Sequence, residues 1–568
     1  MPNRRAADVL ADTMIAHGVD RAFCVPGESY LALLDALHDR PAIDLVVARH
    51  ESGAGFMAVA DARCTGRPGI CLVSRGPGAT NASIAVHSAE QDAAPLIVVI
   101  GQVGRADRGR GAFQEIDYGQ MFGGIAKGVW EVLDGRDLAE RFAAAHAIAI
   151  SGTPGPVVLV VPEDVFDDRV EAPPCAPRPP SRLEPSGDHV DAVADALARA
   201  ARPLVIAGGA LDSPAGRDAL RHTAARHHLP IALSYKRQDL FDNADPLFAG
   251  YLGFKAPRAQ VDLLRGSDLI LAVGTRLTDV TTQNYTFPRA PTPEQALVHV
   301  YPDPAQVGRV FRTDLAITAD PVRLLERLGE RVPPPGPDRR AEWAARLHEC
   351  AARLAAYTPT ARSDGIEFGA MVQSLAKHAA SSAVVSTDGG NFGGWVHRLW
   401  PWTPANRLIG AGSGAMGMGV PGAVAAALRY PDRQVIAMVG DGGFMMTGTE
   451  IATAVQRGVS LTIVVSNNRS YGTIRQQQEL AYPGRVIGSE LPSIDFARMA
   501  EACGARGFRV RTLDEVERVA CAALAAPGVT LLDVETSLEA ISAYTTLAEI
   551  RAGSGSGLQT PDSSSEIR

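Results

Sequence analysis

The sequence predicts an α/β fold made of three doubly wound domains, each formed around a parallel sheet. Short apolar runs rich in β-branched residues alternate along the whole chain with stretches rich in Ala and Leu. Apolar runs without polar alternation are typical of strands that are covered on both faces. Strands that alternate with helices form parallel sheets, because parallel neighbours need a crossover connection. Ligands of such sheets bind at the carboxyl ends of the strands.

Two proline-rich stretches, 172–185 and 332–338, mark the joints between the predicted domains. Proline-rich segments form stiff, extended spacers and do not contribute to a core. We therefore expect domains at 1–171, 186–331 and 339–550. The tail, 551–568, is polar and rich in Gly and Ser, which predicts a disordered segment.

Four apolar runs in each of the three parts are predicted to form strands. They span 43–48, 69–74, 95–101, 156–162, 203–209, 230–235, 269–274, 296–302, 383–390, 434–443, 461–468 and 530–536. Several of them end in Gly, Asp or Asn, so these strand ends are where we expect the chemistry.

Composition narrows the class of protein. The 568 residues can bury several cores, and 46% apolar with 21% charged residues is typical of a soluble protein. Lys and Arg number 55 against 63 Asp and Glu, a net charge of −8, which argues against nucleic-acid binding. The seven cysteines form no CxxC pair, and no apolar run is long enough for a signal peptide or a membrane span. We expect a cytoplasmic enzyme with neither nucleic acid nor membrane as a partner.

Two neighbouring strand ends carry oxygen ligands. The run 434–439 is followed by Gly440-Asp441-Gly442-Gly443, and the next strand, 461–468, ends in two asparagines; a helix is predicted between them, over 447–457. A carboxylate and an amide oxygen suit Mg²⁺, which often shares its shell with phosphate oxygens. Glycines after a strand let backbone N–H groups approach an anion. A plain glycine turn followed by an Asn-rich loop is the alternative.

This pattern, GDGG followed by NN, resembles the signature of the thiamine diphosphate-dependent enzymes of the acetolactate synthase and decarboxylase superfamily. The resemblance covers about 5–550 and implies pyrimidine-binding, central and diphosphate-binding domains in that order. It implies that Asp441, Asn468 and the carbonyl of Ser470 bind Mg²⁺, and that Gly442 and Gly443 lie at the cofactor.

The segment RHESGAGFMA (49–58) resembles the family's cofactor-activating segment. The resemblance implies that Glu51 contacts the aminopyrimidine ring as a catalytic residue, and burial would raise the pKa of such a carboxyl. SRGPGATN (74–81) resembles the adjoining loop and places Gly76 and Asn81 near the cofactor. Outside this context, Glu51 would be a surface carboxylate, and Gly76 and Asn81 a turn and a helix cap.

Two further segments match cofactor-binding loops of the family. GAGSGAMGMGVPGA (410–423) implies that Met416 keeps the cofactor bent and that Gly414 contacts its pyrimidine ring. Gly390, Asn391 and Phe392 occupy the slot that holds the diphosphate, where acetolactate synthases have Gly-Gln-His. Methionines are more often core filler, but glycines flank Met416.

The predicted substrate residues combine matches with departures. FQE (113–115) implies that Gln114 lies in the active site, and Lys127 stands at the position of a family lysine. Arg276 matches the arginine that contacts the second substrate's carboxylate. Gln477 replaces a Trp that selects the acceptor. Glu28 follows Pro26-Gly27 and adds a carboxyl, either in a solvated loop or at the reacting centre, where it would disfavour an anionic acceptor.

The resemblance implies a carboligase that decarboxylates a 2-oxo acid such as pyruvate and adds the remaining fragment to a second carbonyl compound. A non-ligating 2-oxo acid decarboxylase or C–C lyase of the same superfamily is the alternative. The resemblance implies thiamine diphosphate and Mg²⁺ as cofactors. GYLGFK (250–255) departs from the family's flavin contact and argues against FAD, but GGA (208–210) and the turn at Asp303 would leave room for a nucleotide, so FAD stays possible. The resemblance also implies a homodimer or homotetramer with active sites between chains.

Overall fold

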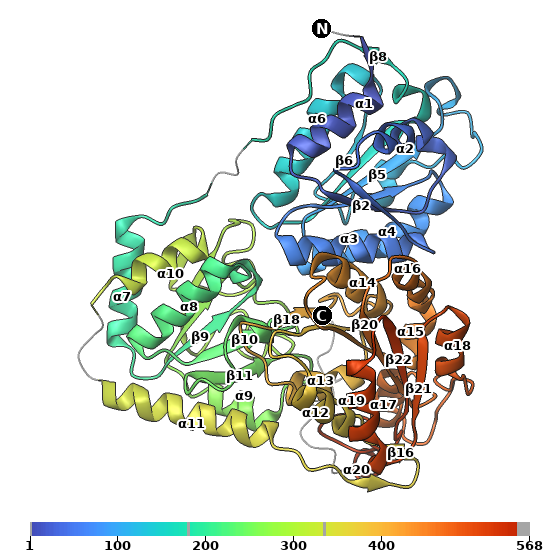
Figure 1. Ribbon diagram of the computed structural model, residues 1–568. Helices are drawn as coiled ribbons and strands as arrows, with labels where there is room; N and C mark the ends of the chain where they lie inside the picture. The colour runs from blue at the N-terminus through green and yellow to red at the C-terminus, as the bar shows by residue number, and fades with distance from the viewer. Residues whose placement is uncertain (1–2, 179–181, 333–336, 554–568) are drawn as a thin grey trace.

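The computed structural model describes residues 3–178, 182–332 and 337–553 and contains three six-stranded parallel sheets (Figure 1). The strand orders are β3-β2-β4-β5-β7-β6, β11-β10-β9-β12-β13-β14 and β18-β17-β19-β20-β22-β21. Helices lie on the faces of each sheet (Figure 1). The predicted fold class, three α/β domains with parallel sheets, is confirmed.

The N-terminal unit contains the first sheet. Its strands are β2 (Arg21–Cys24), β3 (Asp44–Val47), β4 (Gly69–Val73), β5 (Leu96–Gln102), β6 (Gly128–Glu131) and β7 (Pro156–Pro162). Its helices are α1 (Ala6–Ala16), α2 (Leu31–His38), α3 (Glu51–Thr65), α4 (Pro77–Asp92), α5 (Tyr118–Phe122) and α6 (Gly135–Ile150). β1 (Arg4–Arg5) pairs with β8 (Arg169–Val170) and so joins the two ends of this unit.

The central unit contains the second sheet. Its strands are β9 (Pro203–Ala207), β10 (Ile231–Ser234), β11 (Phe248–Leu252), β12 (Leu269–Val273), β13 (Ala296–Tyr301) and β14 (Leu315–Thr318). Its helices are α7 (Gly187–Arg199), α8 (Pro214–His227), α9 (Arg258–Leu264) and α10 (Pro321–Gly329). α11 (Pro337–Ala355) packs Trp343 and Leu347 into this unit's core and leads to the C-terminal unit (Figure 1).

The C-terminal unit contains the third sheet. Its strands are β17 (Val384–Thr387), β18 (Arg407–Ile409), β19 (Val435–Gly440), β20 (Leu461–Asn467), β21 (Arg506–Val510) and β22 (Val529–Glu535), and a small hairpin joins β15 (Ala361–Arg362) to β16 (Gly365–Ile366). Its helices are α12 (Phe368–His378), α13 (Phe392–Leu399), α14 (Gly419–Arg429), α15 (Asp441–Thr447), α16 (Ile451–Gln456), α17 (Gly472–Ala481), α18 (Phe496–Ala502), α19 (Val516–Ala525) and α20 (Leu547–Arg551).

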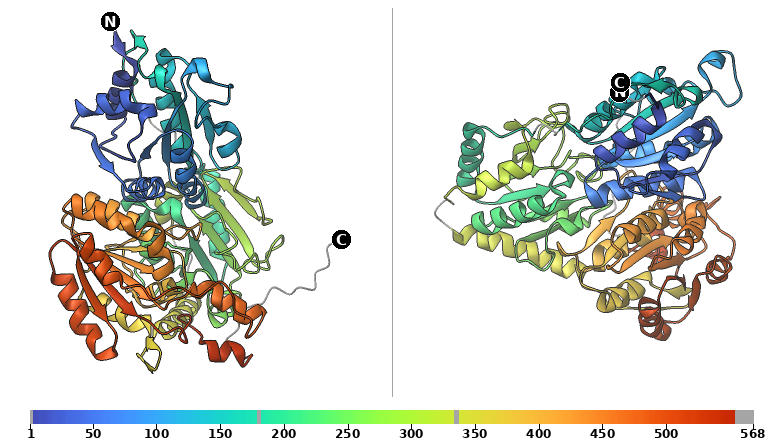
Figure 2. Two further views of the ribbon diagram at one scale, coloured as in Figure 1. Left: turned by 90° about the vertical axis from the view of Figure 1, so that its right-hand side faces the viewer. Right: turned by 45° about the horizontal axis from the view of Figure 1, so that its top comes forward.

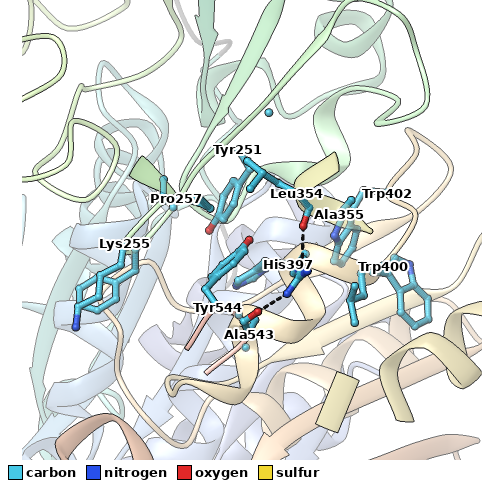
Figure 3. A pocket seen from close by; sticks show the side chains of 18 of the residues that line it. Tyr251, Lys255, Pro257, Leu354, Ala355, His397, Trp400, Trp402, Ala543 and Tyr544 are labelled. Carbon is cyan, nitrogen blue, oxygen red and sulfur yellow. Dashed lines mark hydrogen bonds between the residues drawn. The ribbon is translucent and has the colours of Figure 1, made fainter. Parts of the chain in front are cut away.

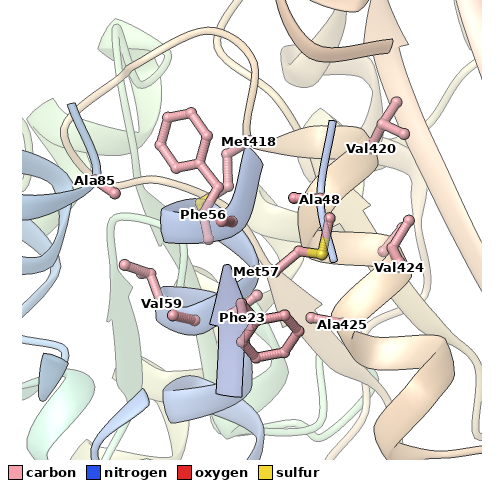
Figure 4. Packing of buried hydrophobic residues seen from close by; sticks show 14 of the residues in the cluster. Phe23, Ala48, Phe56, Met57, Val59, Ala85, Met418, Val420, Val424 and Ala425 are labelled. Carbon is pink, nitrogen blue, oxygen red and sulfur yellow. The ribbon is translucent and has the colours of Figure 1, made fainter. Parts of the chain in front are cut away.

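The N-terminal and C-terminal units share one apolar core. α3 packs against α14, and Phe56 and Met57 lie in the same buried cluster as Met418 and Val424 (Figure 4). Glycine and alanine line both helices, so the helix axes can approach closely. Figure 2 shows the helices of the N-terminal unit seated on the C-terminal unit in both further views.

Buried arginines fix the three units relative to one another. Arg63 of α3 donates to the carbonyls of Gly410 (2.7 Å) and Leu408 (3.1 Å) in the C-terminal unit. Arg407, beside them, pairs with Asp212 of the central unit at 2.5 Å. Such buried pairs are costly to break, so the unit interfaces are well defined in the folded chain.

Each of the predicted strand runs contains a strand. Among the strands of the three six-stranded sheets, β2, β6, β11, β14, β18 and β21 were not predicted. All of these except β2 lie at sheet edges. Edge strands are less covered, and β6 and β21 each have only partly buried or exposed residues along most of their length.

The structure differs from the predicted bounds of one helix and of the C-terminal tail. The helix predicted over 447–457 begins earlier, because α15 starts at Asp441 directly after β19. Of the predicted tail, Arg551 belongs to α20, and 554–568 lies outside the described residues. None of the helices in the described ranges is long and apolar enough to cross a membrane.

Candidate functional site

One edge of the N-terminal sheet collects five predicted site residues: Glu28, Glu51, Gly76, Asn81 and Gln114. They follow β2, β3, β4 and β5, whose carboxyl ends meet at this edge. Gly76 has a left-handed φ of 58°, and a methyl group there would lie 2.8 Å from the Cβ of Gln114. Because Gly76 has no side chain, the loop of Gln114, itself left-handed at 65°, can pack closely against the loop after β4.

Glu51 is the first residue of α3 and is held from two sides. Its Oε2 accepts a hydrogen bond from Asn81 Nδ2 at 2.9 Å, and its Oε1 lies over Gly78. Just before it, the backbone N–H groups of Arg49 and His50 donate to Glu450 of the C-terminal unit at 2.9 and 3.1 Å. Glu450 is fully buried, and burial raises its pKa. The sequence analysis missed Glu450; its only signal was a carboxyl inside an otherwise uncharged stretch.

Glu28 does not stand alone, which corrects the expectation of an uncompensated charge. Its carboxylate pairs with Arg75 at 3.0 Å, and Arg75 also pairs with Glu163 at 2.7 Å. The side chain of Glu28 is 65% exposed, whereas that of Arg75 is 11% exposed. The cation beside Glu28 is therefore Arg75 and not Arg276, and it is shared between the two carboxylates.

The predicted metal ligands converge at the ends of β19 and β20. These strands pair in register, with Gly440 opposite Ser466. The amide N of Ser470 donates to Asp441 Oδ2 at 3.3 Å and to Asn468 Oδ1 at 3.1 Å. Both side-chain oxygens therefore lie close to the same backbone nitrogen. Asn467 instead points away and donates to Asp533 at 2.9 Å. Of the two asparagines, Asn468 is therefore the one that faces Asp441.

Asp441 is a buried carboxylate at the first position of α15. The residue is 5% exposed, and burial raises the pKa of its carboxyl to about 6. Within the described residues it has only backbone N–H partners and no cation within 4.0 Å. The carbonyl of Ser470 accepts from Gly472 N at 2.8 Å and keeps a second lone pair. This donor set suits a hard divalent cation.

A second buried aspartate, Asp388, was missed by the sequence analysis. It follows β17, next to β19, so that the sheet carries two adjacent Asp-Gly-Gly strand ends. Its carboxylate accepts from the backbone N–H of Gly389 (2.9 Å), Gly417 (2.8 Å) and Met418 (3.3 Å). A methyl group at Gly443 would lie 2.5 Å from this carboxylate. The repeated Asp-Gly-Gly was the available signal.

Asp388 brings the predicted cofactor loops together. Gly414 and Met416 lie in the loop that it fastens, and the carbonyl of Gly417 also accepts from Thr447 at 2.5 Å. Gly442 and Gly443 lie in the first turn of α15, next to that loop. The structure therefore places the 414–417 loop beside both Asp-Gly-Gly ends.

The predicted diphosphate slot lies at the start of α13. Gly390 precedes the helix, and the side chain of Phe392 packs edge-on against Phe368 in the core. The side chain of Asn391 bonds Gln476 Oε1 at 3.0 Å and the carbonyl of Ile541 at 3.1 Å. The side chains of Asn391 and Phe392 are thus held by the protein, and the backbone N–H groups of the slot are the groups that could bind an anion.

A cavity of about 590 Å³ lies between the central and C-terminal units, beside this slot (Figure 3). It is lined by Gly390, Asn391 and Gly414 on one side and by residues that follow β10 and β11 on the other. Figure 3 shows Tyr251 and Tyr544 beside His397 in this cavity. We call it the slot cavity.

A second cavity, of about 950 Å³, lies at the carboxyl ends of the central sheet. Gly209, Ala210 and Gly274 line it, together with Arg276. The guanidinium of Arg276 donates to the carbonyls of Glu90 (3.3 Å) and Gln91 at the end of α4. The side chain predicted to contact the substrate therefore caps a helix in this structure.

The structure does not bring Lys127 or Gln477 to either cavity. The Lys127 ammonium donates to the carbonyls of Ile148 (2.6 Å) and Thr153 (2.8 Å) around the end of α6, and burial lowers its pKa to about 8. These bonds use the donors that a catalytic role would need. On α17, Gln477 is exposed, and its neighbour Gln476 lines the slot cavity.

Comparison with known proteins agrees with this geometry. The thiamine pyrophosphate enzyme family matches with its N-terminal TPP binding domain at 4–121, its central domain at 190–328 and its C-terminal TPP binding domain at 388–534. The acetolactate synthase large subunit of Parasynechococcus marenigrum is 33% identical over 93% of this chain and 87% of its own length. The isozyme 1 large subunit of Escherichia coli is 31% identical over 89% of each chain. The mitochondrial catalytic subunit of Saccharomyces cerevisiae is 30% identical over 93% of this chain and 80% of its own. The chain therefore belongs to the thiamine pyrophosphate enzyme family, with acetolactate synthase catalytic subunits among its relatives.

Proposed function

We propose that this chain is a thiamine diphosphate-dependent carboligase that acts on a 2-oxo acid such as pyruvate, as an acetolactate synthase does. The observation that carries the proposal is the convergence of Asp441 and Asn468 on the amide of Ser470, at the strand ends beside the 414–417 loop. The relatives named above are acetolactate synthases, and the chain matches most of their length.

The residues present fit a magnesium diphosphate. Asp441 is a buried carboxylate without a cation among the described residues, which is a costly arrangement unless a positive charge joins it. Asp441, Asn468 and the Ser470 carbonyl would hold Mg²⁺. The backbone at 390–392 and at 442–443 would hold the diphosphate at the starts of α13 and α15.

Thiamine diphosphate, when bound, would supply the carbon that adds to the 2-oxo acid and would take up the electron pair that stays behind when CO₂ leaves. Glu51 would hold a proton at the cofactor's pyrimidine nitrogen, because Asn81 and Gly78 fix its carboxyl at the edge of the sheet. Met416 and Gly414 would support the bent cofactor. Glu450 would position Glu51 by holding the two preceding backbone N–H groups.

A second copy of the chain would complete this site. Glu51 faces Asn81 near the start of α4, whereas the 412–413 loop meets the far end of the same helix, where Ser413 bonds Ser88 at 3.1 Å. Asn81 and Ser88 are about 10 Å apart along the helix. Exposed apolar side chains also flank each half-site, Phe113 (76%) beside Gln114 and Met445 (49%) beside Asp441. We therefore propose a homodimer or a dimer of dimers with Glu51 facing the partner's metal-binding unit.

The second cavity, at the carboxyl ends of the central sheet, would take a nucleotide such as FAD. Its volume of about 950 Å³, its place at the strand ends and its glycines at 209 and 274 fit such a ligand. The carboxylate of Asp92, at its wall, also leaves one buried oxygen without a hydrogen-bond partner among the described residues. Absorption spectra of the purified protein, before and after denaturation, test for a released flavin.

The experiment that tests the proposed function is product analysis by mass spectrometry. After dialysis against a chelator, the enzyme should be inactive, and Mg²⁺ with thiamine diphosphate should restore acetolactate formation from pyruvate. Acetaldehyde as the sole product would favour the non-ligating decarboxylase. Full activity without metal and cofactor would overturn the assignment.

A further inference from the structure

Lys236 is a buried lysine whose charge is not matched by a hydrogen-bond acceptor. It follows β10 at the carboxyl end of the central sheet and is 1% exposed. Its ammonium has no hydrogen-bond partner among the described residues. Its backbone has a left-handed φ of 54°, which is strained for a residue with a side chain. A protein tolerates such a group mainly where it serves a site.

The position of Lys236 links it to the predicted cofactor loops. Lys236 lines the slot cavity together with Asp388, Gly390 and Gly414. Its Nζ lies 3.2 Å from where a Cβ on Gly410 would stand, at the start of the loop that carries Met416. Lys236 therefore lies between the 410–418 loop and the cavity that adjoins the predicted diphosphate slot.

The rest of the cavity suits a small organic anion with an apolar body. Tyr251, Phe254, Trp400 and Tyr544 line it. Figure 3 shows Tyr251, Trp400 and Tyr544 among the aromatic side chains of this cavity. The charged groups that act on Lys236 are two carboxylates, Asp92 and Asp388, and two arginines, Arg63 and Arg237, so its positive charge is only partly offset. An incoming carboxylate would supply the acceptor that Lys236 lacks.

Two arguments select the acceptor over the donor 2-oxo acid. The donor must lose its carboxylate as CO₂, and an ammonium fixed on that carboxylate would stabilise the bound substrate more than the transition state. The acceptor keeps its carboxylate in the product, so the same contact helps throughout the addition. Arg276, which the resemblance assigns to this task, is occupied at the end of α4.

We propose that Lys236 is a specificity-determining residue that binds the carboxylate of the acceptor 2-oxo acid in the slot cavity. This inference rests on the proposed carboligase function. It assigns the preference for an anionic over a neutral acceptor to one side chain.

The test is acceptor competition in Lys236→Met, which keeps the length of the side chain and removes the charge. With pyruvate as donor, and pyruvate and benzaldehyde as competing acceptors, the ratio of acetolactate to aromatic hydroxyketone should fall about 10- to 100-fold, the effect of losing one charged hydrogen bond. Release of CO₂ in the presence of benzaldehyde and the affinity for thiamine diphosphate should stay within about twofold. The matched control is Lys377→Met, because Lys377 is 65% exposed and pairs with Glu517 on the surface.

A second measurement uses the unaltered enzyme. The chain has four lysines, at 127, 236, 255 and 377, so mass spectrometry can follow acylation of each one. Oxamate, a pyruvate analogue that cannot be decarboxylated, should slow acylation of Lys236 several-fold and leave Lys377 unaffected. This arm reports on Lys236 even if the wild type forms no ligation product, in which case the proposed function fails separately.

Three results would overturn the proposal. One is an unchanged product ratio in a folded Lys236→Met enzyme. Another is a loss of cofactor or flavin binding in that variant without a change in the ratio, which would place Lys236 at a cofactor. The third is a change of ratio in Lys255→Met alone, because Lys255 is the other lysine of this cavity whose ammonium lacks a hydrogen-bond partner among the described residues.

Discussion

Replacing Asp388 with alanine tests whether one buried carboxylate organises the cofactor loops. The carboxylate bonds the N–H groups of Gly417 and Met418 at 2.8 and 3.3 Å, and both of these residues are buried. An unsatisfied buried donor costs about 1–3 kcal/mol, so two of them cost about 2–6 kcal/mol. Burial raises the pKa of Asp388, so removing its charge returns part of that cost. We expect a net loss of about 2–4 kcal/mol in the stability of the 410–418 loop.

Because the loop must be ordered to hold the cofactor, the affinity for thiamine diphosphate should fall about 30- to 700-fold. Asp388→Asn should lose less than about tenfold, since an amide oxygen can still accept from Gly417. The assay is a titration of intrinsic fluorescence with the cofactor at fixed Mg²⁺, with thermal unfolding as a check of the fold. The exposed Asp432→Ala is the control. Wild-type affinity in a folded Asp388→Ala enzyme would refute the reasoning.

Three further outcomes are expected. Glu51→Gln should keep the hydrogen bond from Asn81 and bind the cofactor normally. Its kcat should fall about 10²- to 10⁴-fold, because the amide no longer holds a proton at the cofactor's pyrimidine nitrogen. An equal loss in cofactor affinity would point to a structural role instead. Sedimentation should show a dimer or larger species, and Phe113→Asp should dissociate it with loss of activity; an active monomer would contradict the two-chain site. Burial lowers the pKa of Lys236 to about 8, so its protonated, anion-binding form is lost as pH rises through that value, and the ratio of acetolactate to neutral-acceptor product should fall above about pH 8. The groups that face Lys236 are Asp92, Asp388, Arg63, Arg237, His397 and Tyr235, and a ratio that is flat across this range would contradict the assignment.

The central strands and their carboxyl ends were predictable because both depend on local pattern. A fully buried strand such as β20 must be apolar at every position, and its end must carry the polar residues that the sheet brings to one edge. The pairing of Asp441 with Asn468 follows from the neighbouring positions of β19 and β20. Edge strands such as β21 were missed because exposure on one side allows polar residues that break the apolar run.

The roles of Glu450 and Asp388 could not be predicted, because each depends on a contact between distant segments. Glu450 acts through the backbone of Arg49 and His50, some 400 positions away. Asp388 acts through Gly417, whose position relative to β17 is set by the sheet order and not by sequence spacing. A single sequence shows the side chain but not its partner.

The same limit explains why acceptor specificity was the weakest part of the sequence analysis. Taken as an isolated charge, Glu28 predicts repulsion of an anionic acceptor, but Arg75 lies 3.0 Å from it and offsets part of that charge, which it shares with Glu163. Taken by its motif, Arg276 predicts a carboxylate contact, but it caps the end of α4. Charges with partners exert little net force on a ligand, whereas a buried charge without one exerts the most. On that criterion Lys236, which no motif singles out, is the cation of the slot cavity best placed to select an anionic acceptor.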